Sequence, residues 1–181
     1  MLIRPATWLI AVSALATACA PTVGVRRPAP FPGAVVAPAA DPLSVPAAPL
    51  DLPRLVQTAL ALQGTRYQLG GDTPGRGFDC SGFVRYLFNE QGWELPRTVS
   101  EQFAYGRTIR EGDIRAGDLL FFATESRGAT HIGMAVDSGD VPNVRSGHPF
   151  VHAPGENGVV RVDVLESTYW RARFLGARRL F

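Results

Sequence analysis

The sequence contains no lysine and has little cysteine and histidine. All 18 basic residues are arginine, and they stand against 16 acidic residues, which leaves a formal net charge of +2. Without lysine there is no Schiff-base chemistry and no lysine-dependent phosphate loop. So small a net charge does not indicate a nucleic-acid partner. Two cysteines exclude a disulfide-dense scaffold and a four-cysteine metal site. His131, His148 and His152 are the only histidines available for acid–base chemistry.

The apolar content is sufficient for one folded domain, but it is unevenly arranged. Apolar residues make up 46% of the 181 residues, so a core can be buried. Ten of the 15 prolines lie within the first 53 residues, and the stretch from 20 to 52 is rich in proline, alanine and valine without an apolar period. Such a segment favours extended, polyproline-like chain. We therefore expect residues 20–52 to be a disordered linker and residues 53–181 to form the folded domain.

The N-terminus is expected to be a signal peptide. Arg4 precedes an uncharged run, residues 8–18, that is too short to span a bilayer as a helix, which needs about 20 residues. Small residues follow and end at Cys19, which is typical of a bacterial lipoprotein signal, although Leu15 lies four residues before the cysteine instead of three. Residues 1–19 are therefore interpreted as a lipoprotein signal, with Cys19 lipidated and tethering the protein to a membrane surface. Plain secretion is the alternative.

Within the folded part, the apolar period changes from helical to strand-like. Apolar residues recur at helical spacing over 52–62 and over 83–88, with Asp79 or Ser81 as the cap of the second helix. A short helix is expected within the loop at 96–105. Strands are expected at 118–122, 131–136, 150–153, 160–164 and 173–180. Helices followed by a run of strands indicate an α+β fold.

Cys80 is a candidate nucleophile. It follows a glycine-rich loop at the expected start of a helix, where the helix dipole and free N–H groups favour a thiolate. If Cys19 is lipidated, Cys80 has no cysteine to pair with, although the protein enters an envelope where disulfides are common. A buried structural cysteine is the alternative that the sequence leaves open.

Two histidines can serve such a thiol. His131 begins an expected strand, and an imidazole within hydrogen-bond distance of a thiol can take its proton and later donate one to a leaving amine. His152 lies inside an apolar strand, where the ring needs a partner, and that partner can be the second nitrogen of His131. A surface His131 and a core His152 bonded to backbone are the alternatives.

His148 and His152 also have a spacing found in some metal sites. No cysteine pair or acidic cluster completes a zinc site nearby, Pro149 intervenes, and the segment is strand-like. We therefore expect neither a metal nor a cofactor.

The segment around Cys80, FDCSGFV at 78–84, resembles the nucleophile motif of the NlpC ("new lipoprotein C") family of bacterial cell-wall cysteine peptidases. Further segments match in the same order, over about residues 55–181: GTRYQLGG (64–71), LPRT (95–98) with EQ (101–102), GDLLFF (117–122), HIGM (131–134), VHA (151–153) and GARR (176–179). The resemblance implies a papain-like α+β fold, with N-terminal helices packed on an antiparallel sheet. It also implies hydrolysis of peptide bonds in the stem peptides of peptidoglycan.

The resemblance assigns a role to each matching position. Cys80 matches the nucleophile, His131 the general base and acid, and His152 the polar residue that orients the imidazole. Four positions match residues of the substrate cleft: Tyr67, which lines the site and can help stabilise an oxyanion, Asp79 and Ser81, which in some members bind the amine end of a stem peptide, and Arg97, a partner for a stem carboxylate.

The stretch from 137 to 149 is longer than in compact members of this family. It either reshapes the cleft or is a solvated loop, and a shifted register would make His148 the third residue in place of His152. Two other functions remain open: a catalytically silent envelope lipoprotein that binds peptidoglycan or a partner, and a related thiol amidase or acyltransferase. The expected location is the cell envelope, at the periplasmic face of the outer membrane if Cys19 is lipidated, and otherwise the periplasm or the exterior.

Overall fold

The structure, a computed structural model, describes residues 49–181. The expected signal peptide at 1–19, with Cys19, and the expected linker up to residue 48 lie outside the described residues. The first helix, α1 (Leu52–Ala61), begins one residue before the expected boundary at 53. Asp51 caps it, because the Asp51 carboxylate accepts a hydrogen bond from the N–H of Arg54 at 3.1 Å.

The second expected helix is α2 (Cys80–Asn89), and its cap is Asp79. The short helix expected within 96–105 is α3 (Val99–Phe103). Thr98 and Glu101 form a capping box at its start, in which each side chain accepts a hydrogen bond from the other residue's backbone N–H. The starts of these helices are therefore determined by capping residues as much as by the apolar period of the sequence.

The main sheet of the described residues has six antiparallel strands in the order β3-β8-β4-β5-β6-β7. Five of them lie where the sequence predicts strands, within one residue at each end. The strands are β3 (Arg107–Ile109), β4 (Leu119–Phe122), β5 (His131–Ala135), β6 (Pro149–His152), β7 (Arg161–Val164) and β8 (Phe174–Arg179).

Four small elements were not predicted. They are strand β3, the two strands β1 (Asp72–Thr73) and β2 (Gly77–Phe78), which pair with each other, and helix α4 (Thr168–Arg171). None is longer than four residues, so none is long enough to show a period in the sequence.

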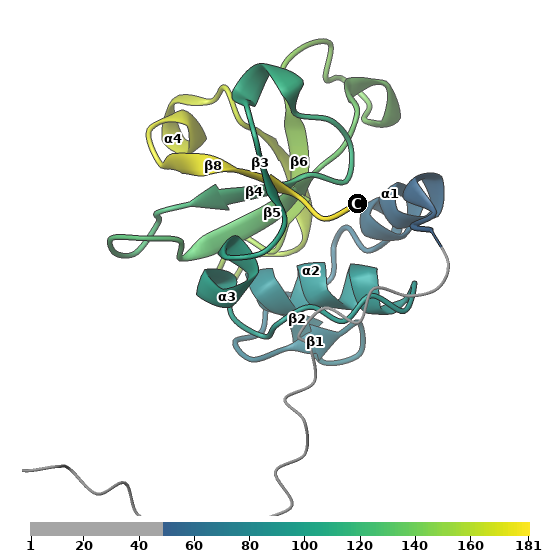
Figure 1. Ribbon diagram of the computed structural model, residues 1–181. Coiled ribbons are helices and arrows are strands. Elements are labelled where there is room, and N and C mark those ends of the chain that lie inside the picture. The colour runs from purple at the N-terminus through teal and green to yellow at the C-terminus, as the bar shows by residue number, and fades with distance from the viewer. Residues whose placement is uncertain (1–48) are drawn as a thin grey trace, which may run out of the picture. The chain divides into compact units, whose positions relative to one another are not determined.

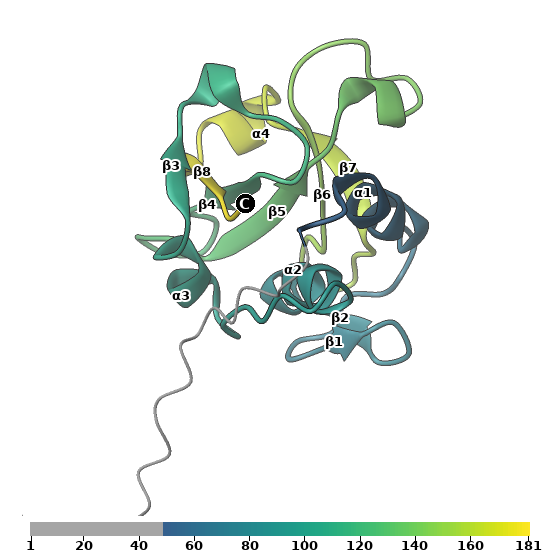
Figure 2. The same cartoon turned by 45° about the vertical axis from the view of Figure 1, so that its right-hand side comes forward.

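The helices are divided between the two faces of the sheet. In both views α2 and α3 lie on one side of the sheet and α4 lies on the other, with the β1–β2 pair on the outer side of α2 (Figures 1 and 2). The fold is therefore the expected α+β arrangement of helices on an antiparallel sheet.

Successive side chains of strand β4 point alternately into two apolar cores. Leu119 and Phe121 of β4 pack with α1 and α2, whereas Leu120 and Phe122 pack with Trp170 of α4. All four β4 side chains are fully buried. This explains the continuous apolar run LLFF at 119–122, because a strand covered on both faces has no solvent-facing residues.

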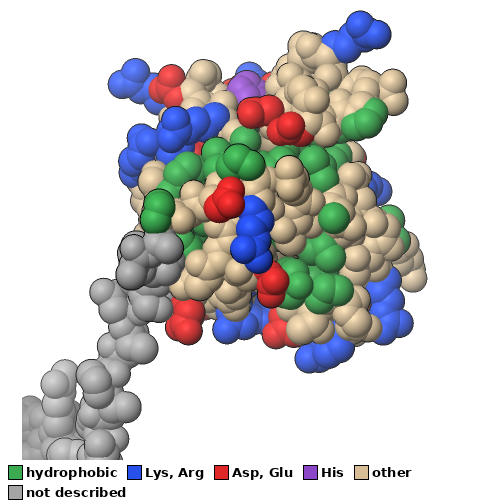
Figure 3. Space-filling view, turned by 90° about the vertical axis from the view of Figure 1, so that its right-hand side faces the viewer, with side chains coloured by type: hydrophobic (Ala, Val, Ile, Leu, Met, Phe, Trp, Pro, Cys, Tyr) green, Lys and Arg blue, Asp and Glu red, His purple; other side chains and the backbone are tan. Residues whose placement is uncertain are grey.

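The surface mixes charges of both signs. The face shown in Figure 3 carries acidic and basic side chains side by side with apolar patches between them, in keeping with the net charge of +2. Within residues 49–181, no helix is long and apolar enough to cross a bilayer.

Candidate active site

Cys80 lies at the start of α2, close to the end of β5 that is not paired with β6. Cys80 is the first residue of the helix, and Asp79 fixes this start because its Oδ1 accepts the Gly82 N–H at 2.7 Å. β5 pairs with β6 only over its last two residues, so the first residues of β5 extend beyond that pairing. The backbone of Ile132, the residue that follows His131, lies close enough to the sulfur to lower the pKa of the thiol. The thiol and His131 are therefore neighbours.

A close backbone contact holds the first turn of α2 in place. A Cβ on Gly82 would lie 2.1 Å from the carbonyl oxygen of Gly71, which also accepts the Asp79 N–H at 3.0 Å. The N–H of Gly70 donates to Asp79 Oδ2 at 2.9 Å. Because only glycine leaves room for this contact, the loop can pack directly against the turn that begins with Cys80.

The resting thiol is protonated, which corrects the expectation of a thiolate. Burial, with a smaller contribution from the Asp79 carboxylate, raises the pKa of Cys80 to about 11. The nearby backbone groups of Ile132, Ser81 and Cys80 itself lower this pKa, but burial outweighs them. The helix start alone therefore does not ionise the thiol, and a neighbouring base is needed.

The rings of His131 and His152 are paired, as the sequence predicts. Nε2 of His131 lies 2.8 Å from Nδ1 of His152, with the ring planes at 88°. His131 is 4% exposed and His152 is completely buried. Because Nε2 of His131 is engaged in this contact, its Nδ1 is the nitrogen left for the thiol.

Three residues that the sequence analysis did not single out complete this site. Oδ2 of Asp163 accepts hydrogen bonds from Nε2 of His152 at 3.0 Å, Nε1 of Trp170 at 3.0 Å and Nη2 of Arg161 at 3.1 Å. The Trp170 indole stacks on His131, with centroids 5.3 Å apart and planes at 22°. The alternation in β7 predicts that positions 161 and 163 share a face, but the register that sets them beside His152 is a tertiary feature.

These surroundings keep both imidazoles neutral. Burial lowers the pKa of His131 to about 3, with a further contribution from His152, and burial also lowers the pKa of His152, while Asp163 opposes both shifts. Burial alone would raise the pKa of Asp163, but hydrogen bonds from His152, Arg161 and Trp170 outweigh it and lower this pKa to about 2. At neutral pH the site therefore holds a thiol, two neutral rings and one carboxylate.

Stability is expected to fall as the pH drops below about 6.5. The folded pKa values of His131 and His152 lie below the unfolded value, so the unfolded chain binds more protons in this range. For His131, whose folded pKa is about 3, the loss amounts to about 1.4 kcal/mol per pH unit below 6.5, and His152 acts in the same direction. Thermal unfolding measured between pH 7.5 and 4.5 should show the decline, and His131→Phe should flatten it. A melting temperature that is constant over this range would contradict the two pKa shifts.

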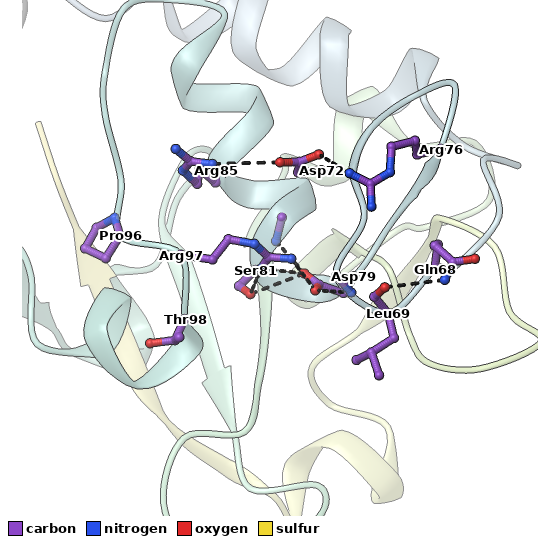
Figure 4. Close-up of polar contacts among 12 residues, drawn as sticks. Gln68, Leu69, Asp72, Arg76, Asp79, Ser81, Arg85, Pro96, Arg97 and Thr98 are labelled. Atoms are coloured by element: carbon purple, nitrogen blue, oxygen red, sulfur yellow. Dashed lines mark hydrogen bonds and ion pairs between the residues drawn. The ribbon is translucent and has the colours of Figure 1, made fainter.

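Asp79, Ser81 and Arg97 form a network at the start of α2 (Figure 4). Arg97 donates to both carboxylate oxygens of Asp79, at 3.0 Å and 2.5 Å, and to Ser81 Oγ at 2.9 Å. With the two backbone donors from Gly70 and Gly82, these bonds occupy both carboxylate oxygens. Asp79 and Arg97, expected to bind charges of the substrate, therefore bind each other in this structure.

Tyr67 lies near Cys80 and Asp79. Burial raises the pKa of its hydroxyl, and the neighbouring Cys80 and Asp79 raise it further. Tyr67 forms a backbone bridge with Phe78, just before α2, and its N–H donates to the carbonyl of Gly158 at 2.8 Å. The protonated hydroxyl is able to donate a hydrogen bond in the site.

The long loop after β5 does not shape this site. It leaves the end of β5 opposite to His131 and lines hollows with Val56, Arg115 and their neighbours. His148 binds Glu166, through Nδ1 at 2.7 Å and its backbone N–H, so it is not the partner of His131. The alternative in which His148 replaces His152 is therefore wrong for this structure.

Two further features are separate from the thiol. In the described part of the chain, no group of three or more histidine, cysteine, aspartate or glutamate side chains is placed to hold a metal ion. A hollow of about 530 Å³ lies beside Asp163, between β7 and α4, and neither Cys80 nor His131 lines it. Asp163 lines this hollow, so its carboxylate is accessible to solvent there.

Comparison with protein families gives a match to the model of the NlpC/P60 family over residues 64–179. The murein DD-endopeptidase MepS/murein LD-carboxypeptidase of Escherichia coli (strain K12) is 39% identical over 119 residues, which are 65% of this chain and 57% of that protein. The gamma-DL-glutamyl hydrolase of Bacillus subtilis (strain 168) is 34% identical over 129 residues, 70% of this chain and 29% of that protein. The chain thus spans less than two thirds of the length of these relatives.

Solved structures show the same fold. A protein from Staphylococcus aureus subsp. aureus Mu50, described as similar to lipoprotein of the NLP/P60 family, aligns with a TM-score of 0.61 and 29% identity, over 76% of this chain and 44% of that one. The NlpC/p60 domain of the peptidoglycan hydrolase SagA aligns with a TM-score of 0.58 and 30% identity, over 72% of this chain and the whole of that domain.

Proposed function

Because the chain belongs to the NlpC/P60 family, we propose that it is a cysteine peptidase that hydrolyses amide bonds in the stem peptides of peptidoglycan. The observation that carries this proposal is the placement of Cys80 at a helix start, beside the paired rings of His131 and His152. The names of the relatives, a murein endopeptidase and a glutamyl hydrolase, support this substrate class.

The proposed reaction begins with proton transfer to His131. Its unprotonated Nδ1 takes the Cys80 proton as the sulfur attacks the amide carbonyl, so the proton moves during attack and not before it. The backbone N–H of Cys80 stabilises the tetrahedral oxyanion, with the Tyr67 hydroxyl as a second donor. The protonated ring then donates its proton to the departing amine, which leaves a thioester on Cys80.

Hydrolysis of the thioester repeats these roles. Nδ1 of His131 accepts a proton from water, whose oxygen attacks the thioester carbonyl, and the oxyanion forms again at the same donors. Collapse breaks the carbon–sulfur bond and releases the acid product. The proton on His131 returns to the sulfur, so the neutral thiol and ring are restored.

We propose that Asp79, Ser81 and Arg97 form one wall of the substrate cleft as a connected unit. The Arg97 side chain is 36% exposed, so part of the guanidinium remains accessible to a stem carboxylate. A substrate amine, in contrast, has to displace one of the donors already bound to Asp79. This arrangement favours carboxylate recognition over amine recognition at this wall.

The proposed location is the cell envelope. A signal peptide at 1–19 would export the protein, lipidation of Cys19 would tether it to a membrane, and the proline-rich stretch would let the peptidase reach the wall. Mass analysis of the protein recovered from the envelope tests the anchor. A diacylated or triacylated Cys19 supports it, and an unmodified N-terminus at residue 19 or 20 contradicts it.

The proposed activity is tested by incubating the chain with purified muropeptides, monomeric and crosslinked, and measuring the masses of the products by mass spectrometry. Cleavage within one stem, between D-glutamate and the diamino acid, and cleavage of the crosslink give products of different mass. The reaction should stop after alkylation of the thiol and continue in the presence of a chelator. Folded, reduced protein that cleaves neither substrate would contradict the proposal and favour a binding lipoprotein.

A further inference from the structure

Asp163 lies at the far end of a chain of hydrogen bonds that begins at His131. Oδ2 of Asp163 lies 3.0 Å from Nε2 of His152, whose Nδ1 lies 2.8 Å from Nε2 of His131. We propose that Asp163 is a positioning residue of the proposed peptidase, which fixes the tautomer of His131 through His152. The proposal rests on the proposed function for its catalytic consequence, but its structural claim can be measured without a substrate.

The tautomers follow from the donors and acceptors in the chain. An ionised carboxylate only accepts, so Nε2 of His152 carries the hydrogen that Asp163 binds. Nδ1 of the neutral His152 is then an acceptor, and Nε2 of His131 must donate to it. Nδ1 of His131 is consequently left with its lone pair, which is the form that can accept the thiol proton.

The surroundings of Asp163 hold it in this role. Trp170 donates its indole N–H to the same Oδ2 and stacks its ring on His131, so it contacts both ends of the hydrogen-bond chain that runs from Asp163 through His152 to His131. Arg161 bonds the carboxylate from the outer side through Nη2 and Nε. The Asp163 side chain is 24% exposed, whereas His152 is completely buried, so the charge sits at the solvent-facing end of the chain.

Asp163→Asn tests the proposal in the full chain. An asparagine amide presents either its oxygen or its NH₂ group to His152, so the tautomer of His131 is no longer fixed. We expect kcat on muropeptides to fall by about 10²–10⁴-fold with KM little changed, by analogy with the loss of the carboxylate in a serine-protease triad. ¹⁵N NMR of the ring nitrogens should show the Nε2–H tautomer of His131 in the unmodified protein and a mixture in the variant.

Glu166→Gln is the matched control. It makes the same acid-to-amide change in a carboxylate that binds a histidine, His148, outside the candidate site, and it leaves Asp163 bonded to His152 and Trp170. We expect kcat within about threefold of the unmodified protein and an unchanged His131 tautomer. A loss of kcat as large as that of Asp163→Asn would indicate a general structural role for this corner and overturn the assignment.

The remaining outcomes separate this inference from the proposed function. An Nδ1–H tautomer of His131 in the unmodified protein contradicts the proposed role of Asp163 in fixing that tautomer, whether or not Asp163→Asn folds. Full kcat in a folded Asp163→Asn variant also overturns it. A protein that cleaves no muropeptide but shows the Nε2–H tautomer, lost in Asp163→Asn, supports this role of Asp163 and contradicts the proposed function.

Discussion

Replacement of Cys80 by alanine is expected to abolish hydrolysis of muropeptides, with kcat reduced by about 10⁴-fold or more. The sulfur forms the thioester in the proposed reaction, and among residues 49–181 no second cysteine is present to replace it. Initial rates measured by chromatography of the products, at equal concentrations of folded protein, give the comparison.

The fold should survive this change. Cys80 is only partly buried, at the edge of the core, and alanine is a good residue for the first turn of a helix. The variant should therefore melt within a few degrees of the unmodified protein and still bind substrate. Ser81→Ala, one residue along the same turn, is a useful comparison because it removes a hydroxyl from the cleft wall but leaves the thiol. Residual cleavage by Cys80→Ala at a tenth of the original rate would contradict a nucleophilic thiol.

Replacement of Asp118 by asparagine is expected to cost about 3 kcal/mol of stability. Asp118 is completely buried and binds Arg179 through two hydrogen bonds, from Nε at 2.6 Å and from Nη2 at 2.7 Å. Arg179 itself is 6% exposed, so the variant leaves a guanidinium buried without its counter-charge. Thermal unfolding should show a melting temperature lower by roughly 10 °C for a domain of this size.

Two further variants test whether the broken Asp118–Arg179 ion pair is the cause of the lower stability. Arg107→Met changes an exposed arginine directly opposite Arg179 in the sheet and should alter stability by less than about 0.5 kcal/mol. The double replacement of Asp118 and Arg179 by leucine should recover much of the stability lost in Asp118→Asn, because neither charge is then left unpaired. Equal melting temperatures for Asp118→Asn and the unmodified protein would contradict a buried, structural ion pair.

The sequence predicts the helices and strands well because the apolar period and the helix caps depend only on residues that are close together in the chain. The long helices and five strands follow from apolar spacing, and their ends follow from residues such as Asp51 and Thr98. The segments that resemble the family motifs are explained only by their contacts in the folded protein. GDLLFF and GARR meet through the Asp118–Arg179 pair, and the glycine of HIGM, Gly133, leaves room for the His152 side chain, since a Cβ there would lie 3.0 Å from that of His152.

The candidate site is predicted less completely. The sequence singles out Cys80, His131 and His152, whose residue types carry recognisable chemistry. It does not single out Asp163, because an acidic residue in an alternating strand usually faces solvent, and only the β6–β7 register turns it toward His152. Burial reverses the expected ionisation of Cys80, because desolvation depends on the packing of α2 against the sheet and not on the helix start alone.

Trapping the acyl-enzyme tests the proposed thiol mechanism most directly. Acid quenching of the chain during turnover of a muropeptide, followed by tryptic digestion and mass spectrometry, examines the peptide 77–85, which carries Cys80. We predict that this peptide gains the mass of the acyl part of the substrate, and that the adduct disappears when the substrate is exhausted. Muropeptide cleavage that continues with no adduct on this peptide, and that persists after Cys80 has been alkylated, would contradict a thiol peptidase.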